Sequence, residues 1–137
     1  MKKNTKGFTL VELLAVIVIL AIIALIATPM ILNVIDEAKK GAAQSSAYGY
    51  IDAVEKSLLE NMVSSQSVVT LSGTYTVDAS GNLVDASSNV ISVNVKGDKP
   101  SENGTLVYSN GKLTSGSLTV NGYTFTADSN GSLAISK

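Results

Sequence analysis

The stretch LLAVIVILAIIALIATPMILNVI, residues 13–35, is an uncharged run of 23 residues. Glu12 precedes it and Asp36 follows it. As a helix it would span roughly 34 Å at about 1.5 Å per residue, more than the hydrocarbon core of a bilayer at about 30 Å. Lys2, Lys3 and Lys6 precede the run, and basic residues in this place predict a cytoplasmic N-terminus. The simplest interpretation is a single-pass anchor with the C-terminal part outside.

An ordinary secretory signal fits the same segment less well. The apolar part of such a signal is usually about 7–15 residues long and is followed by a small-residue cleavage site of the Ala-x-Ala kind. Here the run is longer, and no such triplet follows it closely. The anchor interpretation is therefore the stronger of the two.

Glu12 sets this segment apart from a plain anchor. A carboxylate in a membrane helix costs about 2.5–3.5 kcal/mol at the centre and less near an end, so it is expected only where it has a partner. The stretch KGFTLVELL, residues 6–14, resembles the cleavage and methylation signature of type IV prepilins. The resemblance extends from Lys6 to about Pro29.

The chain has no cysteine, which hints at a Gram-positive source.

The resemblance implies a processing site and an assembly contact. In that family a membrane peptidase cuts after the glycine, here Gly7, and methylates the new amino terminus, here Phe8. Gly7 has no side chain, so the backbone can enter a tight peptidase site. Glu12 lies one helical turn after Phe8, so its carboxylate can neutralise that amine or the amine of a neighbouring subunit. In the family the partner is the adjacent subunit.

Thr28-Pro29 interrupts the apolar run. Proline removes one backbone hydrogen bond and strains the preceding turn, so we expect a helix kink or break at Pro29. The family commonly has a proline here and often a glycine upstream, where this chain has Ala21. A bent helix without functional loosening is an equally open interpretation.

The helix is expected to continue well beyond the apolar run, over residues 8–62 in all. Apolar residues at steps of three or four predict one buried stripe on its second half: Tyr48, Ile51, Val54, Leu58 and Met62. The first half is apolar all round and suits packing against copies of itself. The second half has one apolar face, which suits packing against a sheet.

From Val68 the hydrophobic period becomes two, which predicts short strands. The alternating apolar residues are Ile91, Val93 and Val95, and then Tyr123, Phe125 and Ala127. Glycine supplies the positive φ of tight turns, and such signals lie at Ser80-Gly81, Asn110-Gly111, Asn121-Gly122 and Asn130-Gly131. Thr74–Val84 aligns without gaps on Thr124–Ala134, so we expect the same strand–turn–strand hairpin twice.

The predicted fold class is α+β. One long N-terminal helix packs the C-terminal half of its length against a small antiparallel β-sheet of four to six strands, as in pilins. The chain then divides into four parts: a cleaved basic leader at 1–7, a transmembrane and filament-core helix at 8–35, an amphipathic helix half at 36–66, and a β-sheet domain at 67–137.

Composition argues against catalysis, cofactors and nucleic acid. Histidine and cysteine are absent, and the acidic residues are scattered, so no nucleophile–base pair or metal site is apparent. Asp78–Asn82 and Asp128–Ser132 loosely resemble calcium loops, but turn formation is the stronger interpretation. Without residues 1–7 the chain has 7 Lys against 11 acidic residues, a charge balance that does not favour binding to phosphate.

The stretch Lys96–Gly104 has no aliphatic or aromatic residue. We interpret it as a solvated connector, and a recognition loop is the less favoured interpretation.

The function that the resemblance implies is structural. We expect the subunit of a type IV pilus that serves adhesion, motility or aggregation. The alternatives are a pseudopilin of a type II secretion or DNA-uptake system, and a membrane-anchored surface binding domain that never polymerises. The expected partners are copies of the same chain, a prepilin peptidase/N-methyltransferase, the membrane and the pilus assembly machinery. The expected location is the cytoplasmic membrane before assembly and the cell surface afterwards.

We expect Glu12→Val and Glu12→Ala to permit membrane insertion and cleavage but to impair assembly. The reason is that an unpaired amine buried between apolar helices is heavily penalised. Filament yield from cells that express each variant measures the effect. A wild-type yield from Glu12→Val would contradict the assigned role.

Overall fold

The computed structural model describes residues 7–64 and 71–136, and the chain divides into two compact units, Met1–Ala38 and Lys39–Lys137. One helix, α1 (Leu10–Ser64), begins in the first unit and ends in the second. Its bounds lie two residues from the predicted 8–62 at each end. The single long N-terminal helix is therefore confirmed.

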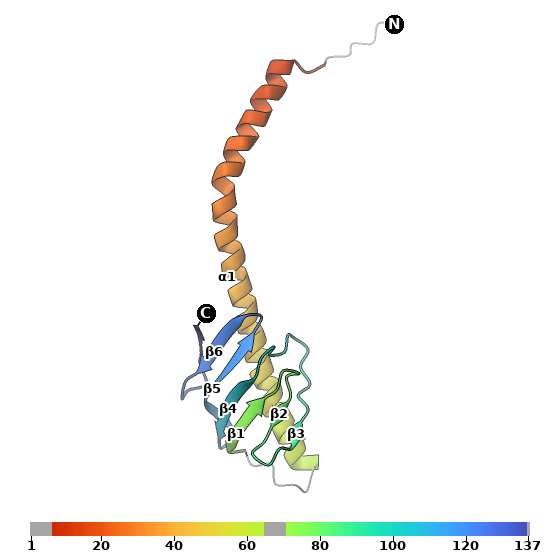
Figure 1. Cartoon of the computed structure of the whole chain (residues 1–137), viewed down its shortest axis with the longest axis vertical. Helices are drawn as coiled ribbons and strands as arrows, with labels where there is room; N and C mark the ends of the chain where they lie inside the picture. Colours follow the sequence, from red (N-terminus) through yellow and green to blue (C-terminus); the bar gives the residue numbers. More distant parts are fainter. Residues whose placement is uncertain (1–6, 65–70, 137) are drawn as a thin grey trace, which may run out of the picture. The chain divides into compact units, whose positions relative to one another are not determined.

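Seven strands form one antiparallel sheet in the second unit (Figure 1). The strands are β1 (Gly73–Val77), β2 (Leu83–Val84), β3 (Val90–Ile91), β4 (Gly104–Ser109), β5 (Lys112–Val120), β6 (Tyr123–Ala127) and β7 (Leu133–Ser136). Their order is β3-β2-β1-β4-β5-β6-β7. The chain thus forms one meander from β1 to β3, returns to place β4 beside β1, and continues in a second meander. The predicted α+β, pilin-like fold is confirmed.

The turns between the longer strands follow the glycine signals in the sequence. Asn110-Gly111 joins β4 to β5 and Asn121-Gly122 joins β5 to β6, with φ positive at all four residues. This backbone twist matches that of the flanking strands, and Asn-Gly adopts it at low cost. Both two-residue hairpins are as predicted.

Three other hairpins share a five-residue loop that begins with aspartate. The carboxylate Oδ1 of Asp78, Asp85 or Asp128 accepts the backbone N–H groups two and four residues later, at 2.8 to 2.9 Å. The fourth residue has positive φ in each: 75° at Gly81, 66° at Ser88 and 79° at Gly131. The repeated hairpin predicted from the sequence is therefore confirmed in β1–β2 and β6–β7. A third copy, between β2 and β3, was not predicted.

The face of α1 that packs on the sheet is rotated from the predicted stripe. Ile51, Val54 and Leu58 are buried as expected, whereas Tyr48 is 39% exposed and Met62 is 44% exposed. The prediction was wrong for these two residues. The buried face also contains small or polar residues that a search for large apolar side chains passes over: Ala43, Ala47, Tyr50 and Ser57. Ala43 and Ala47 are fully buried, so the buried face of α1 begins nearer the N-terminus than the predicted stripe.

The strand count and one strand length also differ from the prediction. The sheet has seven strands rather than four to six, because β2 and β3 contribute two residues each. Strand β3 is Val90–Ile91, so Ile91 alone of the expected strand from Ile91 to Val95 joins the ladder. Val93 is nevertheless buried, and Val95 packs against the core. The alternating apolar residues of this segment therefore continue to face the core after the backbone hydrogen bonds of β3 have ended.

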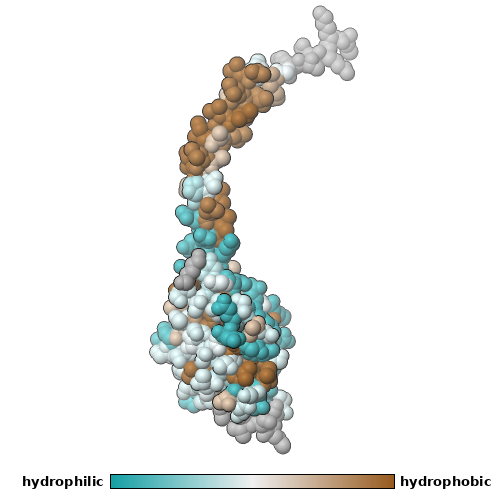
Figure 2. Space-filling model, in the orientation of Figure 1, coloured by the Kyte–Doolittle hydropathy of each residue, from teal (hydrophilic) through white to brown (hydrophobic). Residues whose placement is uncertain are grey.

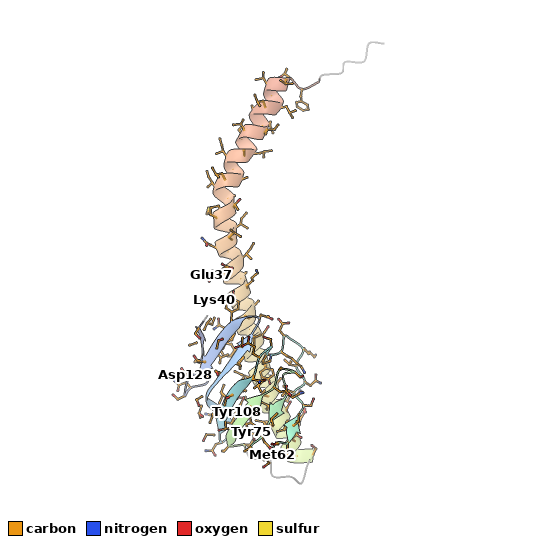
Figure 3. The ribbon with its side chains drawn as sticks, viewed as in Figure 1. Glu37, Lys40, Met62, Tyr75, Tyr108 and Asp128 are labelled. Carbon is orange, nitrogen blue, oxygen red and sulfur yellow. The ribbon has the colours of Figure 1, made fainter. Side chains whose placement is uncertain are left out.

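Two buried tyrosines in the core differ in their hydrogen bonding. The Tyr50 hydroxyl on α1 donates to the carbonyl oxygen of Gly81 at 3.0 Å. Tyr108 on β4 packs edge-to-face against Tyr75 on β1, with ring centroids 6.3 Å apart (Figure 3). Its hydroxyl is buried without a hydrogen-bond partner among the described residues. Burial raises the pKa of both hydroxyls well above the usual range, so both stay neutral.

These two tyrosines give a matched pair of variants. Tyr50→Phe should lower the free energy of unfolding by about 1–2 kcal/mol, because the Gly81 carbonyl loses its buried donor. Tyr108→Phe should leave stability unchanged or raise it by up to about 1 kcal/mol, since it removes an unpaired buried hydroxyl. Denaturant unfolding of the full chain in detergent measures both values. Equal losses in the two variants would contradict the assignment.

Candidate functional site

The start of α1 is fixed by two reciprocal hydrogen bonds. The backbone N–H of Thr9 donates to Oε2 of Glu12 at 3.1 Å, and the N–H of Glu12 donates to Oγ1 of Thr9 at 3.2 Å. The first helical backbone bond runs from Leu13 N–H to the carbonyl oxygen of Thr9 at 3.2 Å. Thr9 is therefore the N-cap and Glu12 the third helical residue, in the arrangement known as a capping box. The sequence analysis missed Thr9, although the pattern Thr-x-x-Glu before an apolar run was a signal for it.

Gly7 and Phe8 lie immediately before this cap and outside the helix. Phe8 is 92% exposed, and a Cβ added to Gly7 would meet nothing within 4 Å. The structure thus brings together three of the predicted site residues, Gly7, Phe8 and Glu12, within one turn of the start of α1. Phe8 and Glu12 also line one open surface hollow with Leu13 and Val16.

The apolar part of α1 has no cover within the described chain. Every Phe, Leu, Ile, Val and Met side chain from Phe8 to Ile35 is at least 41% exposed. Figure 2 shows this as a continuous hydrophobic surface over the N-terminal part of the helix. By length and composition α1 is able to cross a membrane. Apolar surface of this extent requires lipid or another protein surface.

Pro29 lies inside α1, and the helix continues through it without a break. Because proline has no N–H, the carbonyl of Leu25 lacks its usual helical donor. One residue earlier the Thr28 hydroxyl donates to the carbonyl oxygen of Ala24 at 2.6 Å. Bonds of this kind often bend helices. The kink at Pro29 stays a prediction.

A family model described as the prokaryotic N-terminal methylation motif matches residues 2–28. The match contains Gly7, Phe8 and Glu12 and ends just before Pro29. It confirms the signature on which the resemblance of residues 6–14 rests. It gives no support to the Gram-positive source. No curated protein sequence and no solved structure matches the chain significantly.

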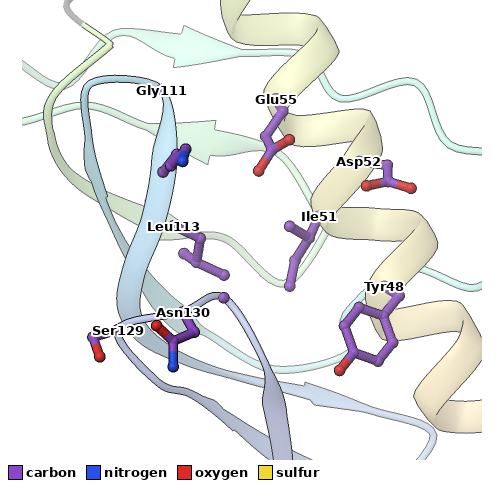
Figure 4. Close-up of a pocket in the computed structure, with 10 residues that line it drawn as sticks. Tyr48, Ile51, Asp52, Glu55, Gly111, Leu113, Ser129 and Asn130 are labelled. Carbon is purple, nitrogen blue, oxygen red and sulfur yellow. The ribbon is translucent and has the colours of Figure 1, made fainter.

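A second hollow lies in the sheet-bearing unit, where α1 faces the β4–β5 and β6–β7 turns (Figure 4). It has a volume of about 420 Å³, and Asp52 and Glu55 contribute carboxylates to its helical wall. Burial, and then the nearby charge of Asp52, raises the pKa of Glu55 above its usual range. Among the described residues no three acidic side chains gather as metal ligands, so two carboxylates alone define no metal site here.

The two loops that resemble calcium sites use their aspartates for turn formation. Oδ1 of Asp78 and Oδ1 of Asp128 each accept two backbone N–H groups, as the turn interpretation predicts. In the third loop of this kind, hydrogen bonds from Asn89 lower the pKa of Asp85 below its usual range. In each of the three loops Oδ1 of the aspartate is thus engaged in closing the turn.

The loop from Lys96 to Gly104 is attached to the sheet at two points. Oδ2 of Asp98 accepts a hydrogen bond from Nδ2 of Asn121 at 2.7 Å, and Ser101 N–H donates to the Thr119 carbonyl at 3.1 Å. Pro100 between them is fully buried. These contacts favour a packed connector over a free recognition loop.

The half-buried Glu55 makes stability depend on pH in a defined direction. A carboxyl whose pKa is raised on folding stabilises the protein below its ordinary value of 4.5 and loses that contribution as pH rises through the folded value. Glu55→Gln should therefore raise the Tm of the full chain at pH 7, and the gain should vanish below about pH 4. Glu60→Gln, at an exposed position of the same helix, is the control and should show little change. A gain of equal size at both pH values would contradict the assignment.

Proposed function

From the N-terminal methylation motif over residues 2–28 we propose that the chain is a prepilin-type protein and the structural subunit of a type IV pilus. In this proposal the precursor enters the cytoplasmic membrane and is cut after Gly7. Phe8 becomes the new N-terminus and is methylated, and the mature chain polymerises through α1. The motif match, together with the position of Gly7 and Phe8 outside the helix, is the observation that supports the proposal most strongly.

The exposed apolar surface of α1 supports the two environments that the proposal requires. Before assembly the segment of residues 8–35 is covered by lipid, since a helix of this length and composition spans a bilayer. After assembly the same side chains are covered by the equivalent segments of other subunits. The basic leader, residues 1–7, stays in the cytoplasm and is removed there.

Glu12 supplies the polar contact in this apolar surface. Cleavage creates an ammonium group at Phe8, and a carboxylate that neutralises it lowers the cost of burying both charges between helices. Pairing with the amine of an adjacent subunit would also fix the register of one subunit against the next. The partners are therefore other copies of the chain, the peptidase that also methylates, and the machinery that moves subunits from the membrane into the fibre.

The β-sheet domain, residues 67–137, is in this proposal the part displayed on the fibre surface. Its role in this proposal is structural and adhesive. Adhesion, motility or aggregation would depend on contacts of this surface. The same N-terminal motif would serve a pseudopilin of a secretion or DNA-uptake machine, which differs in forming a short fibre within the cell envelope.

Mass measurement of the full chain expressed with and without a prepilin peptidase tests the processing. With the enzyme, the product should lack residues 1–7 and carry one added methyl group on Phe8. Without it, the chain should keep its leader and stay in the membrane fraction. An uncut chain in the presence of an active peptidase would refute the proposal.

Electron microscopy of material sheared from the source cells separates the two kinds of fibre. We expect long fibres in which peptides of this chain are identified by mass spectrometry. A cut and methylated chain that is absent from sheared fibres, and remains in the envelope, would favour the pseudopilin. A chain that stays monomeric in the membrane after cutting would favour the anchored binding domain.

A further inference from the structure

We propose that the Thr9–Glu12 pair is a helix stop that keeps the Gly7–Phe8 bond outside α1 in the uncut chain and so positions it for the peptidase. This inference rests on the proposed processing after Gly7. It gives Thr9 a positioning role, and it gives Glu12 a role that precedes its part in assembly.

The reciprocal bonds fix where α1 begins. An N-cap residue accepts a helical N–H with its side chain, which requires a backbone conformation outside the helical region. Thr9 does this through Oγ1, and Glu12 returns the bond by accepting the Thr9 N–H. Because both donors are satisfied by these side chains, the helix gains nothing by extending into Phe8.

The residues beside the cap are apolar and largely exposed. An apolar residue just before the N-cap often packs on the fourth helical residue and fixes the angle at which the chain enters the helix. Phe8 and Leu13 occupy these two positions, and both line the surface hollow at the start of α1. Phe8 nevertheless remains 92% exposed, so the scissile bond lies in exposed, non-helical chain.

Extension of the helix would hide the bond from the peptidase. In a helix the carbonyl of Gly7 would accept the N–H of Val11, four residues later, and the carbonyl carbon would be shielded by that turn. Thr5 is a residue upstream that is itself able to cap a helix. A helix that began after Thr5 would contain Gly7 and Phe8. The stop at Thr9 prevents this.

The capping role of residue 12 and its charge are separable. Glutamine serves in a capping box as glutamate does, because its side-chain oxygen accepts the same N–H bond. Glu12→Gln therefore keeps the helix stop and loses the charge. Glu12→Val loses both, although Oγ1 of Thr9 can still accept the N–H of residue 12. Cutting of Glu12→Val should continue, but at a lower rate.

The test is the initial rate of cutting of the full chain in membranes by a prepilin peptidase, followed by mass. Thr9→Val, which keeps the side-chain shape, should be cut more slowly by up to about fivefold, the change in the helix-stop equilibrium that loss of one N-cap produces. Thr9→Ser and Thr9→Asn, both good N-caps, should be cut at the wild-type rate. Glu12→Gln should match the wild type, and Glu12→Val should be slower. Wild-type rates for both Val variants would overturn the inference.

Direct recognition of the Thr9 hydroxyl by the peptidase is distinguished by NMR of the uncut full chain in micelles. The Cα chemical shifts of Gly7 and Phe8 should move toward helical values in Thr9→Val and return in Thr9→Ser. Slower cutting without such a shift, or no rescue by Thr9→Asn, would overturn the helix stop. If the wild-type chain is not cut at all, the proposed processing fails instead, so the two failures are told apart.

Discussion

The N-terminal part of α1 is the constraint on which the rest of this protein depends. From Phe8 to Ile35 no large apolar side chain is less than 41% exposed, so nothing among the described residues of the chain removes this surface from water. Burial of each such side chain is worth about 1.5–3 kcal/mol. The favourable free energy available from covering the segment is therefore far larger than the stability of a small domain. In the proposed assembly neighbouring subunits replace lipid as that cover, so the apolar surface stays buried throughout.

The sheet-bearing unit has the opposite character. Its core is complete within residues 39–137, where one face of α1 and the inward residues of the strands bury one another. A search for large apolar residues finds Ile51, Val54 and Leu58 but misses Ala43 and Ala47. Small side chains carry little hydrophobic signal, so their place in the buried face is not apparent from the sequence. The position of the buried face is thus decided by tertiary packing, which periodicity alone does not contain.

The sequence predicted the features that depend on one or two residues. Asn-Gly turns were predicted correctly because glycine and asparagine are the residues that accept positive φ. The β2–β3 loop was missed because Ser88 holds that conformation without being glycine. At the N-terminus the isolated Glu12 was recognised by its charge. Its hydrogen-bonding partner Thr9 was not recognised, because a threonine before an apolar run is identified as a helix cap only together with a glutamate three residues later.

Each of the three aspartate loops contains two exposed positions whose side chains do not stabilise the loop. In each loop the first residue supplies the carboxylate and the fourth supplies the positive φ. The second and third residues contribute only backbone groups, and their side chains are exposed: Ala79, Ser80, Ala86, Ser87, Ser129 and Asn130. Any residue with a backbone N–H fits these positions. In the proposed fibre of many copies, one substitution there would be displayed at every repeat, so the outer chemistry could diversify without a change in the fold.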